Sequence, residues 1–329
     1  MKIKDDPKKN DLHSEIDQAG QHDPEEGHSR KIDRYGKAKN RSLQVSKHII
    51  SNYPKKGKIG YKVKDCGTFL LFHNYYTIGQ YRLIRSNFCK KHLLCGLCAI
   101  LRAAKQLQAY LEKVTFVLEE NPKLKLVLVT MTVKNGDDLL ERFNHLRFNY
   151  RKMVQRRRNV LKSNSRTKTD TVFKYFKGAV ATYEFTNKGK GWHPHLHMIC
   201  AVDSDLDIDQ AQKDLKKEWE GLTKDSHQCD IRWIKADNEK DMLSAFCEVF
   251  KYSLKMNDMS IKDQVFAGFE LHKLRLIASF GLFYGVKIPE ELEDSIEEDL
   301  ELLPYFEMLY HFSDSFGYQL KDQTTILPE

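Results

Sequence analysis

One stretch decides the fold of this chain: Gly191-Trp192-His193-Pro194-His195-Leu196-His197-Met198-Ile199-Cys200. Polar and apolar residues alternate along it, which is typical of a β-strand with one face in a core. Residues i and i+2 of a strand point to the same side. His195 and His197 therefore present two imidazoles on one face, and Leu196 and Met198 point into the core. Two imidazoles at this spacing supply half of a divalent-metal site.

A second strand precedes the histidines. Apolar and polar residues also alternate over 181–186, and the segment 187–190 with its glycine predicts a turn. An antiparallel hairpin would bring Glu184 beside the histidines on the neighbouring strand. A glutamate with two histidines suits a catalytic Mg²⁺ or Mn²⁺ that keeps positions open for substrate oxygens. His193, two residues before His195, is the alternative third ligand.

A predicted amphipathic helix downstream carries a second set of reactive groups. Glu248 and Tyr252 are four residues apart, so they lie on one helix face, as do Lys251 and Lys255. Tyrosine can act as a covalent nucleophile. Its pKa is ordinarily about 10, so attack at neutral pH needs a metal on the phosphate and a nearby ammonium group. The alternative is an ordinary helix with an exposed tyrosine.

Four segments in this order resemble the HUH endonucleases, and among them the rolling-circle replication initiators of small bacterial plasmids. Residues 126–135, a strand ending in Thr-x-Thr, look like the family's first motif, and 193–197 look like its metal motif. Residues 248–255 look like the motif of members with a single tyrosine and a glutamate four residues before it. Residues 274–283 look like the segment after the nuclease domain. The resemblance covers roughly 60–285.

The resemblance implies a mechanism. A metal held by His195, His197 and Glu184 would bind a scissile DNA phosphate, and Tyr252 would attack it and become joined to the 5′ phosphate. Lys255 would balance the developing charge. A host polymerase would extend the released 3′-OH, and a host helicase would open the duplex. Glu248 would activate the water that ends the reaction, as a general base.

The cysteines form another group. The chain has 7 cysteines and a polar beginning without an apolar signal segment, so we expect a reducing bacterial cytoplasm rather than a disulfide framework. Four of them predict a closed tetrahedral Zn²⁺ site, with His92 as the alternative to one. These are Cys66, Cys89, Cys95 and Cys98. The remaining three cysteines lie in apolar segments and are assigned to the core.

Charge patterning predicts a DNA partner. Lys and Arg number 54 against 46 Asp and Glu, a formal net charge of +8. Basic residues gather on a predicted helix over 137–162, where they would neutralise phosphates. The residues predicted to contact DNA are Arg147, Arg151, Arg156, Arg157 and, on the later helix, Lys251.

The order of elements predicts an α+β fold: a ferredoxin-like antiparallel sheet with helices on its faces, preceded by a small Cys-rich zinc module. We expect strands at 125–133, 178–187, 192–202 and 228–235. Helices are expected at 97–119, 137–162, 208–224 and 239–256. The expected organisation is a disordered polar tail (1–47), a zinc segment (48–120), the HUH core (121–260) and a C-terminal helical, partly acidic region (261–329).

Within that last region, 289–307 is rich in Glu and Asp with leucines at helical spacing, which predicts an acidic amphipathic helix. It could pack on the core, mediate self-association or meet a host protein. No apolar run has transmembrane length. We therefore expect a plasmid initiator that nicks DNA and transfers strands, with an HUH relaxase or transposase for mobilisation and a non-catalytic zinc-dependent DNA-binding regulator as alternatives.

Overall fold

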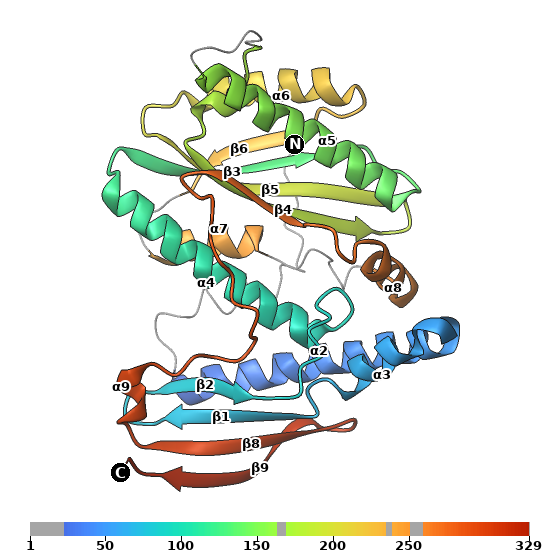
Figure 1. The fold of residues 1–329 in the computed structure, drawn as a ribbon, viewed down its shortest axis with the longest axis vertical. Helices are drawn as coiled ribbons and strands as arrows, with labels where there is room; N and C mark the ends of the chain where they lie inside the picture. Colours follow the sequence, from blue (N-terminus) through green and yellow to red (C-terminus); the bar gives the residue numbers. More distant parts are fainter. Residues whose placement is uncertain (1–22, 163–168, 235–238, 251–258, 329) are drawn as a thin grey trace, which may run out of the picture. The chain divides into compact units, whose positions relative to one another are not determined.

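The computed structural model describes residues 23–162, 169–234, 239–250 and 259–328 (Figure 1). It is a mixed α+β structure with antiparallel sheets, which confirms the expected fold class. The chain forms two compact units. The first takes residues up to Lys105, Gln264–Gly268 and Pro289–Glu329, and the second takes Gln106–Asp263 and Phe269–Ile288.

The second unit is built on a five-stranded antiparallel sheet with the order β6-β3-β5-β4-β7. Its strands are β3 (Leu124–Thr132), β4 (Gly178–Asn187), β5 (Trp192–Asp203), β6 (Cys229–Trp233) and β7 (Ile277–Gly281). The four strands expected between 125 and 235 are confirmed, with ends shifted by two residues or fewer. β7, at the edge beside β4, was not expected.

Helices cover both faces of this sheet (Figure 1). α5 (Leu139–Leu161) and α6 (Ile208–Thr223) lie on one face. The part of α4 (Gly96–Glu120) that belongs to this unit lies on the other face, with α7 (Glu239–Val249). The Asp207 side chain accepts a hydrogen bond from the Gln210 amide at 3.0 Å and so caps the N-terminus of α6.

The two faces of the sheet have separate cores. On the α5 side, the Phe143 ring packs edge-on against Tyr183 at 5.1 Å between centroids. On the α4 and α7 side, buried apolar residues of the helices meet those of the strands, including Tyr110, Val180, Ile199 and Phe250. Burial of these side chains supplies most of the driving force for this layered arrangement.

The first unit contains a four-stranded antiparallel sheet with the order β2-β1-β8-β9. Its strands are β1 (Phe69–Tyr75), β2 (Gln80–Arg85), β8 (Tyr305–Ser313) and β9 (Gly317–Ile326). β1 pairs with β8, so segments more than 200 residues apart share one sheet. The remaining elements are α2 (Pro24–Asn52), η1 (Pro54–Lys56), α3 (Gly57–Asp65), η2 (Val172–Tyr175), α8 (Ile261–Glu270) and α9 (Glu298–Glu301).

The expectation of a disordered tail over 1–47 is wrong for the residues that the structure describes. Residues Pro24–Asn52 form α2, which Asp23 caps by accepting a hydrogen bond from the Glu25 amide at 3.0 Å. Ile32, Val45 and Ile49 are buried along one stripe of the helix. A narrow apolar stripe suffices for a helix that packs on a sheet, and a low average hydrophobicity conceals such a stripe.

The expectation of a helical C-terminal region over 261–329 holds only for α8 and α9, and it is wrong for the rest of the region. Most of 305–326 forms the hairpin of β8 and β9, whose turn ends at Gly317 with a positive φ of 71°. Of the expected acidic helix over 289–307, only Glu298–Glu301 is helical. Its acidic residues serve tertiary contacts instead: Asp294 accepts from the Leu83 amide at 2.8 Å and pairs with Lys105 at 3.2 Å. None of the helices among the described residues has the length and apolarity needed to span a bilayer.

Candidate functional site

β5 carries the histidines as the sequence predicts. Partly exposed residues alternate with buried ones from Trp192 to Met198, and His193, His195 and His197 are the partly exposed members. Leu196 and Met198 are fully buried. The two predicted metal-binding imidazoles therefore share one face of the strand, with stacked rings whose centroids lie 5.8 Å apart at an interplanar angle of 9°.

Strand register places polar partners beside both histidines. Glu184 on β4 lies directly opposite His195, and Thr182 lies opposite His197. The Oε2 of Glu184 lies 3.8 Å from Nε2 of His197, and their side chains are 5% and 12% exposed. From the other side, the Thr130 hydroxyl of β3 lies 3.1 Å from Nδ1 of His197. The hairpin that the sequence predicts thus brings Glu184 to the histidine pair.

His193 has a different environment. Its Nδ1 is hydrogen-bonded to the side chain of Asn135, and its ring lies 4.3 Å from that of His195. It stays the alternative third ligand. The three predicted catalytic ligands also lie less tightly together than the cysteines do. Within the described ranges, only the cysteine group brings three or more possible ligand atoms within 4.8 Å of one another.

The end of α7 lies against the same face of the sheet. The Thr182 hydroxyl, beside His197 in the register, donates a hydrogen bond to the Val249 carbonyl of α7. Glu248, predicted to activate water, forms an ion pair with Arg232 of β6 at 2.7 Å and is 26% exposed. Tyr252, Lys251 and Lys255 lie outside the described residues.

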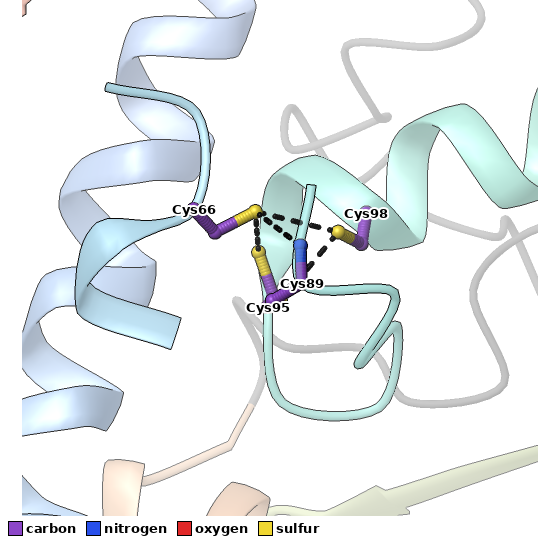
Figure 2. Close-up of side chains that lie close together, drawn as sticks. All are labelled: Cys66, Cys89, Cys95 and Cys98. Carbon is purple, nitrogen blue, oxygen red and sulfur yellow. Dashed lines mark hydrogen bonds between the residues drawn. The ribbon is translucent and has the colours of Figure 1, made fainter. Parts of the chain in front are cut away.

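The first unit holds the cysteine group, and the four predicted residues come together there (Figure 2). Cys66 follows α3, Cys89 lies in the loop after β2, and Cys95 and Cys98 lie at the beginning of α4. Three of the four are buried, and Cys89 is half-buried. His92 is exposed and is not part of this group.

The sulfur positions suit a tetrahedral metal. The Sγ of Cys66 lies 3.5 Å from Sγ of Cys98 and 3.6 Å from Sγ of Cys95, and Cys89 lies 3.7 Å from Cys98. Four thiolates about 2.3 Å from one zinc ion would be about 3.8 Å apart. Hydrogen bonds from the other three thiols lower the pKa of Cys95, whereas hydrogen bonds with neighbouring thiols and burial raise the pKa of Cys66 and of Cys98. Binding of a metal to all four as thiolates would therefore release protons.

A buried lysine accompanies the cysteine group. The Nζ of Lys39 donates to the Cys66 carbonyl at 2.6 Å, and its side chain is 1% exposed. Burial lowers the pKa of Lys39, and the nearby sulfurs of Cys66 and Cys95 oppose that shift. Four thiolates around a divalent ion carry a net charge of −2, so a buried ammonium group beside them compensates part of that charge.

The basic residues of α5 divide into two groups. Arg147 and Arg151 line an open groove beside β7. Arg156 instead forms an ion pair with Glu218 at 3.0 Å, and Arg157 donates to the Phe176 carbonyl at 2.8 Å. DNA contact stays a prediction for all four residues, but the last two have structural partners within the unit.

Sequence reasoning missed three residues that surround the sites. Thr130 was noted only as part of a motif, Arg232 had no assigned role, and Lys39 fell in the segment expected to be disordered. For Thr130, the Thr-x-Thr spacing on a strand was an available signal, because it puts both hydroxyls on one face. Arg232 and Lys39 act through tertiary contacts, which no local pattern indicates.

Comparisons with known proteins all point to replication proteins. Residues 80–307 match the family model described as a replication protein. The chain is 25% identical to "Protein rep" of Staphylococcus aureus over 240 residues, which covers 70% of this chain and 96% of the relative. It is 28% identical to "Protein rep" of Lactiplantibacillus plantarum over 262 residues, with 74% and 78% covered. No solved structure matches.

Proposed function

We propose that this chain, which belongs to the replication protein family, initiates plasmid replication by nicking one strand of its origin and joining itself to the 5′ end. The family match and the relatives named "Protein rep" support the role of plasmid replication initiator. The nicking chemistry, its residues and its metals are our proposal. The register that groups Glu184, His195 and His197 on one sheet face carries it.

His195, His197 and Glu184 would hold a divalent cation, Mg²⁺ or Mn²⁺. Two imidazoles and a carboxylate suit such an ion. Ligand atoms about 2.1 Å from an octahedral ion lie about 3.0 Å apart, so Glu184 Oε2 and His197 Nε2, which are separated by 3.8 Å, would move closer together when the ion binds. When bound, the ion would polarise the scissile phosphate. Thr130 would accept a hydrogen bond from Nδ1–H of His197, which leaves Nε2 as the ligand atom.

Tyr252 would be the nucleophile. Its phenolic oxygen would form a bond to phosphorus while the bond from phosphorus to the 3′ oxygen breaks. The phenol proton would leave to solvent, and the 3′ oxygen would take up a proton from solvent to give the 3′-OH. The hydrogen bond between Thr182 and Val249 supports this role, because it ties the end of α7 to the strand beside the histidines. Tyr252 follows Val249 by three residues, and three residues of chain span at most about 11 Å. Lys255 would balance the developing negative charge.

Glu248 would act in the second cleavage, as the general base for water. Its ion pair with Arg232 orients the carboxylate. Hydrolysis by water leaves no second covalent adduct on the protein, so one chain would complete one round. A host helicase and polymerase would open and copy the duplex, and self-association stays a further prediction.

The cysteine group would bind zinc in a structural role. The sulfur spacing and burial support a closed site without a position for substrate. We also propose that the second unit is ferredoxin-like. The run β3-α5-β4-β5-α6-β6 and its strand order β6-β3-β5-β4 support that assignment.

The direct test is a nicking assay with the supercoiled replicon that encodes the protein. Samples with Mn²⁺ or Mg²⁺, with EDTA and with the Tyr252→Phe variant would be resolved on a denaturing gel. We expect a protein-linked strand that requires both metal and Tyr252. A covalent adduct formed by the Tyr252→Phe variant would show that Tyr252 is not the nucleophile. Binding without any nick would support the DNA-binding regulator instead.

A further inference from the structure

A groove of about 660 Å³ lies between α5 and the segment that contains β7, within the second unit. Its volume falls in the range of about 300–1,000 Å³ that ligand sites occupy. One wall is the part of α5 from Arg147 to Arg158, and the other consists of residues from Arg275 to Tyr284. The proposed mechanism uses none of the residues from the second wall.

The lining is cationic. It includes Arg147, Arg151, Lys152 and Arg158 from α5 and Arg275 before β7, and it includes no acidic side chain. Within the described part of the chain, none of these five forms an ion pair with a carboxylate. Five like charges around one groove repel one another. An anionic ligand with several charges would relieve that repulsion, as a phosphate backbone does.

Aromatic side chains accompany the charges. The Phe148 side chain is 59% exposed and that of Tyr284 is 71% exposed, although both are large. The Nζ of Lys152 lies 4.4 Å from the Phe148 ring centroid. The floor of the groove consists of buried aromatic residues, namely Tyr150, Tyr183 and Phe280. Exposed rings beside cations are the arrangement with which proteins bind unpaired bases, because each ring offers a face for stacking.

We infer that this groove binds a run of single-stranded DNA, with arginines on the phosphates and with Phe148 and Tyr284 stacking on bases. The inference rests on the proposed function, which makes DNA the ligand. The groove lies on the α5 side of the sheet, whereas His195 and His197 share the face on which Thr182 meets α7. The DNA held here is therefore a segment other than the phosphate that is cleaved.

The test is a binding titration in the Tyr252→Phe protein, so that cleavage does not intervene. The probes are a labelled 20-nucleotide thymidine oligomer and a 20-base-pair duplex, followed by fluorescence anisotropy at several salt concentrations. One variant removes three groove charges, another removes both rings, and a control removes three exposed lysines of α6. These are Arg147→Ala with Arg151→Ala and Arg275→Ala; Phe148→Ala with Tyr284→Ala; and Lys213→Ala with Lys216→Ala and Lys217→Ala.

We expect the groove-charge variant to bind the oligomer at least about tenfold more weakly, with a salt dependence lower by about two counterions. The ring variant should lose at least about tenfold on the oligomer and less than about twofold on the duplex. The α6 control should stay within about twofold of the parent. Thermal melting identifies any variant that has lost its fold, and Phe148→Tyr, which keeps a ring, should then retain oligomer binding.

Two results would overturn the inference. Groove variants that bind the oligomer like the parent or like the α6 control would show that the groove holds no DNA. A ring variant that loses oligomer and duplex equally would make it a duplex surface. Failure of the proposed function is a separate observation: protein with Tyr252 intact would bind the oligomer through the groove but form no covalent adduct with its own replicon.

Discussion

The cysteine group and the histidine strand are two candidate metal sites with opposite designs. The four cysteines come from three segments of the first unit, and their sulfurs lie within 4.8 Å of one another. The histidines and Glu184 come from one hairpin of the second unit, on a face where the imidazoles remain partly exposed. The first arrangement would enclose an ion completely, and the second would leave coordination positions open.

This difference in geometry indicates that the two sites have different roles. A closed tetrahedral set of thiolates stabilises a fold and offers no position to a substrate. An open set of imidazoles and a carboxylate contributes little to folding and leaves coordination positions for phosphate oxygens.

Loss of a cysteine should affect folding most. We expect Cys66→Ser to lose bound zinc and to lower the free energy of unfolding by roughly 5 kcal/mol, because metal binding to such sites is itself folding energy. Zinc content and thermal unfolding measure this effect. Cys229→Ser, at a half-buried cysteine outside the group, should keep both values. A Cys66→Ser protein with normal zinc content would remove the cysteine site.

Loss of a histidine should affect catalysis and leave folding unchanged. We expect His197→Ala to slow nicking by about 10³-fold or more, which is about 4 kcal/mol of activation free energy. Its unfolding temperature and zinc content should match those of the wild type. The matched control is His193→Ala, which should retain nicking if Glu184 is the third ligand. If His193→Ala is as inactive as His197→Ala, His193 takes that place.

Glu248 should separate the two cleavage steps. We expect Glu248→Gln to nick at a rate near that of the wild type and to slow the terminating hydrolysis by about 10²-fold, as loss of a general base does. Arg232→Gln should produce a smaller defect in the same step, because it removes the ion pair at 2.7 Å but keeps the carboxylate. Single-turnover assays measure nicking and release separately. Equal losses in both steps would contradict this role.

The smallest effect concerns packing in the first unit away from the cysteines. Burial between Tyr81 and Phe72 lowers the pKa of His28 from 6.5 to about 4. The unfolded chain gains this proton near pH 6.5 and the folded chain only near pH 4. The contribution of neutral His28 to the free energy of unfolding is therefore complete above pH 6.5 and is lost as the pH falls toward 4.

We expect protonation of His28 to lower the free energy of unfolding by on the order of 2 kcal/mol as the pH falls through this interval. Urea unfolding at pH 7 and pH 4.5 measures the change. His28→Phe should lose less stability between the two pH values than the wild type loses. Equal losses in both proteins would show that His28 does not limit the acid stability of this unit.

The sequence predicted the second unit well because its signals are local. The alternation of polar and apolar residues along 181–186 and 192–198 depends only on neighbours in the chain. The pairing of Glu184 with His195 followed from a short hairpin, in which the turn determines the register. The cysteine group was also predictable from the sequence, because four cysteines that include one Cys-x-x-Cys pair are typical of a metal site.

The first unit was largely missed because its contacts are long-range. β1 and β8 are paired across more than 200 residues. The turns that follow these strands lead to β2 and β9, so they do not indicate that β1 pairs with β8. The ion pair of Arg232 with Glu248 and the burial of Lys39 likewise depend on tertiary packing. Local patterns predict elements, but they do not predict which distant element will cover them.

The most direct test of the contrast is to remove the open-site metal while the closed-site metal remains. Purified protein would be treated briefly with EDTA, and the same sample would be assayed for zinc content and for nicking before and after Mn²⁺ is added. We predict one zinc per chain throughout, with nicking lost after EDTA and restored by Mn²⁺. Nicking that persists in EDTA, or that returns only with added zinc, would contradict the assignment of the histidine strand as the catalytic site.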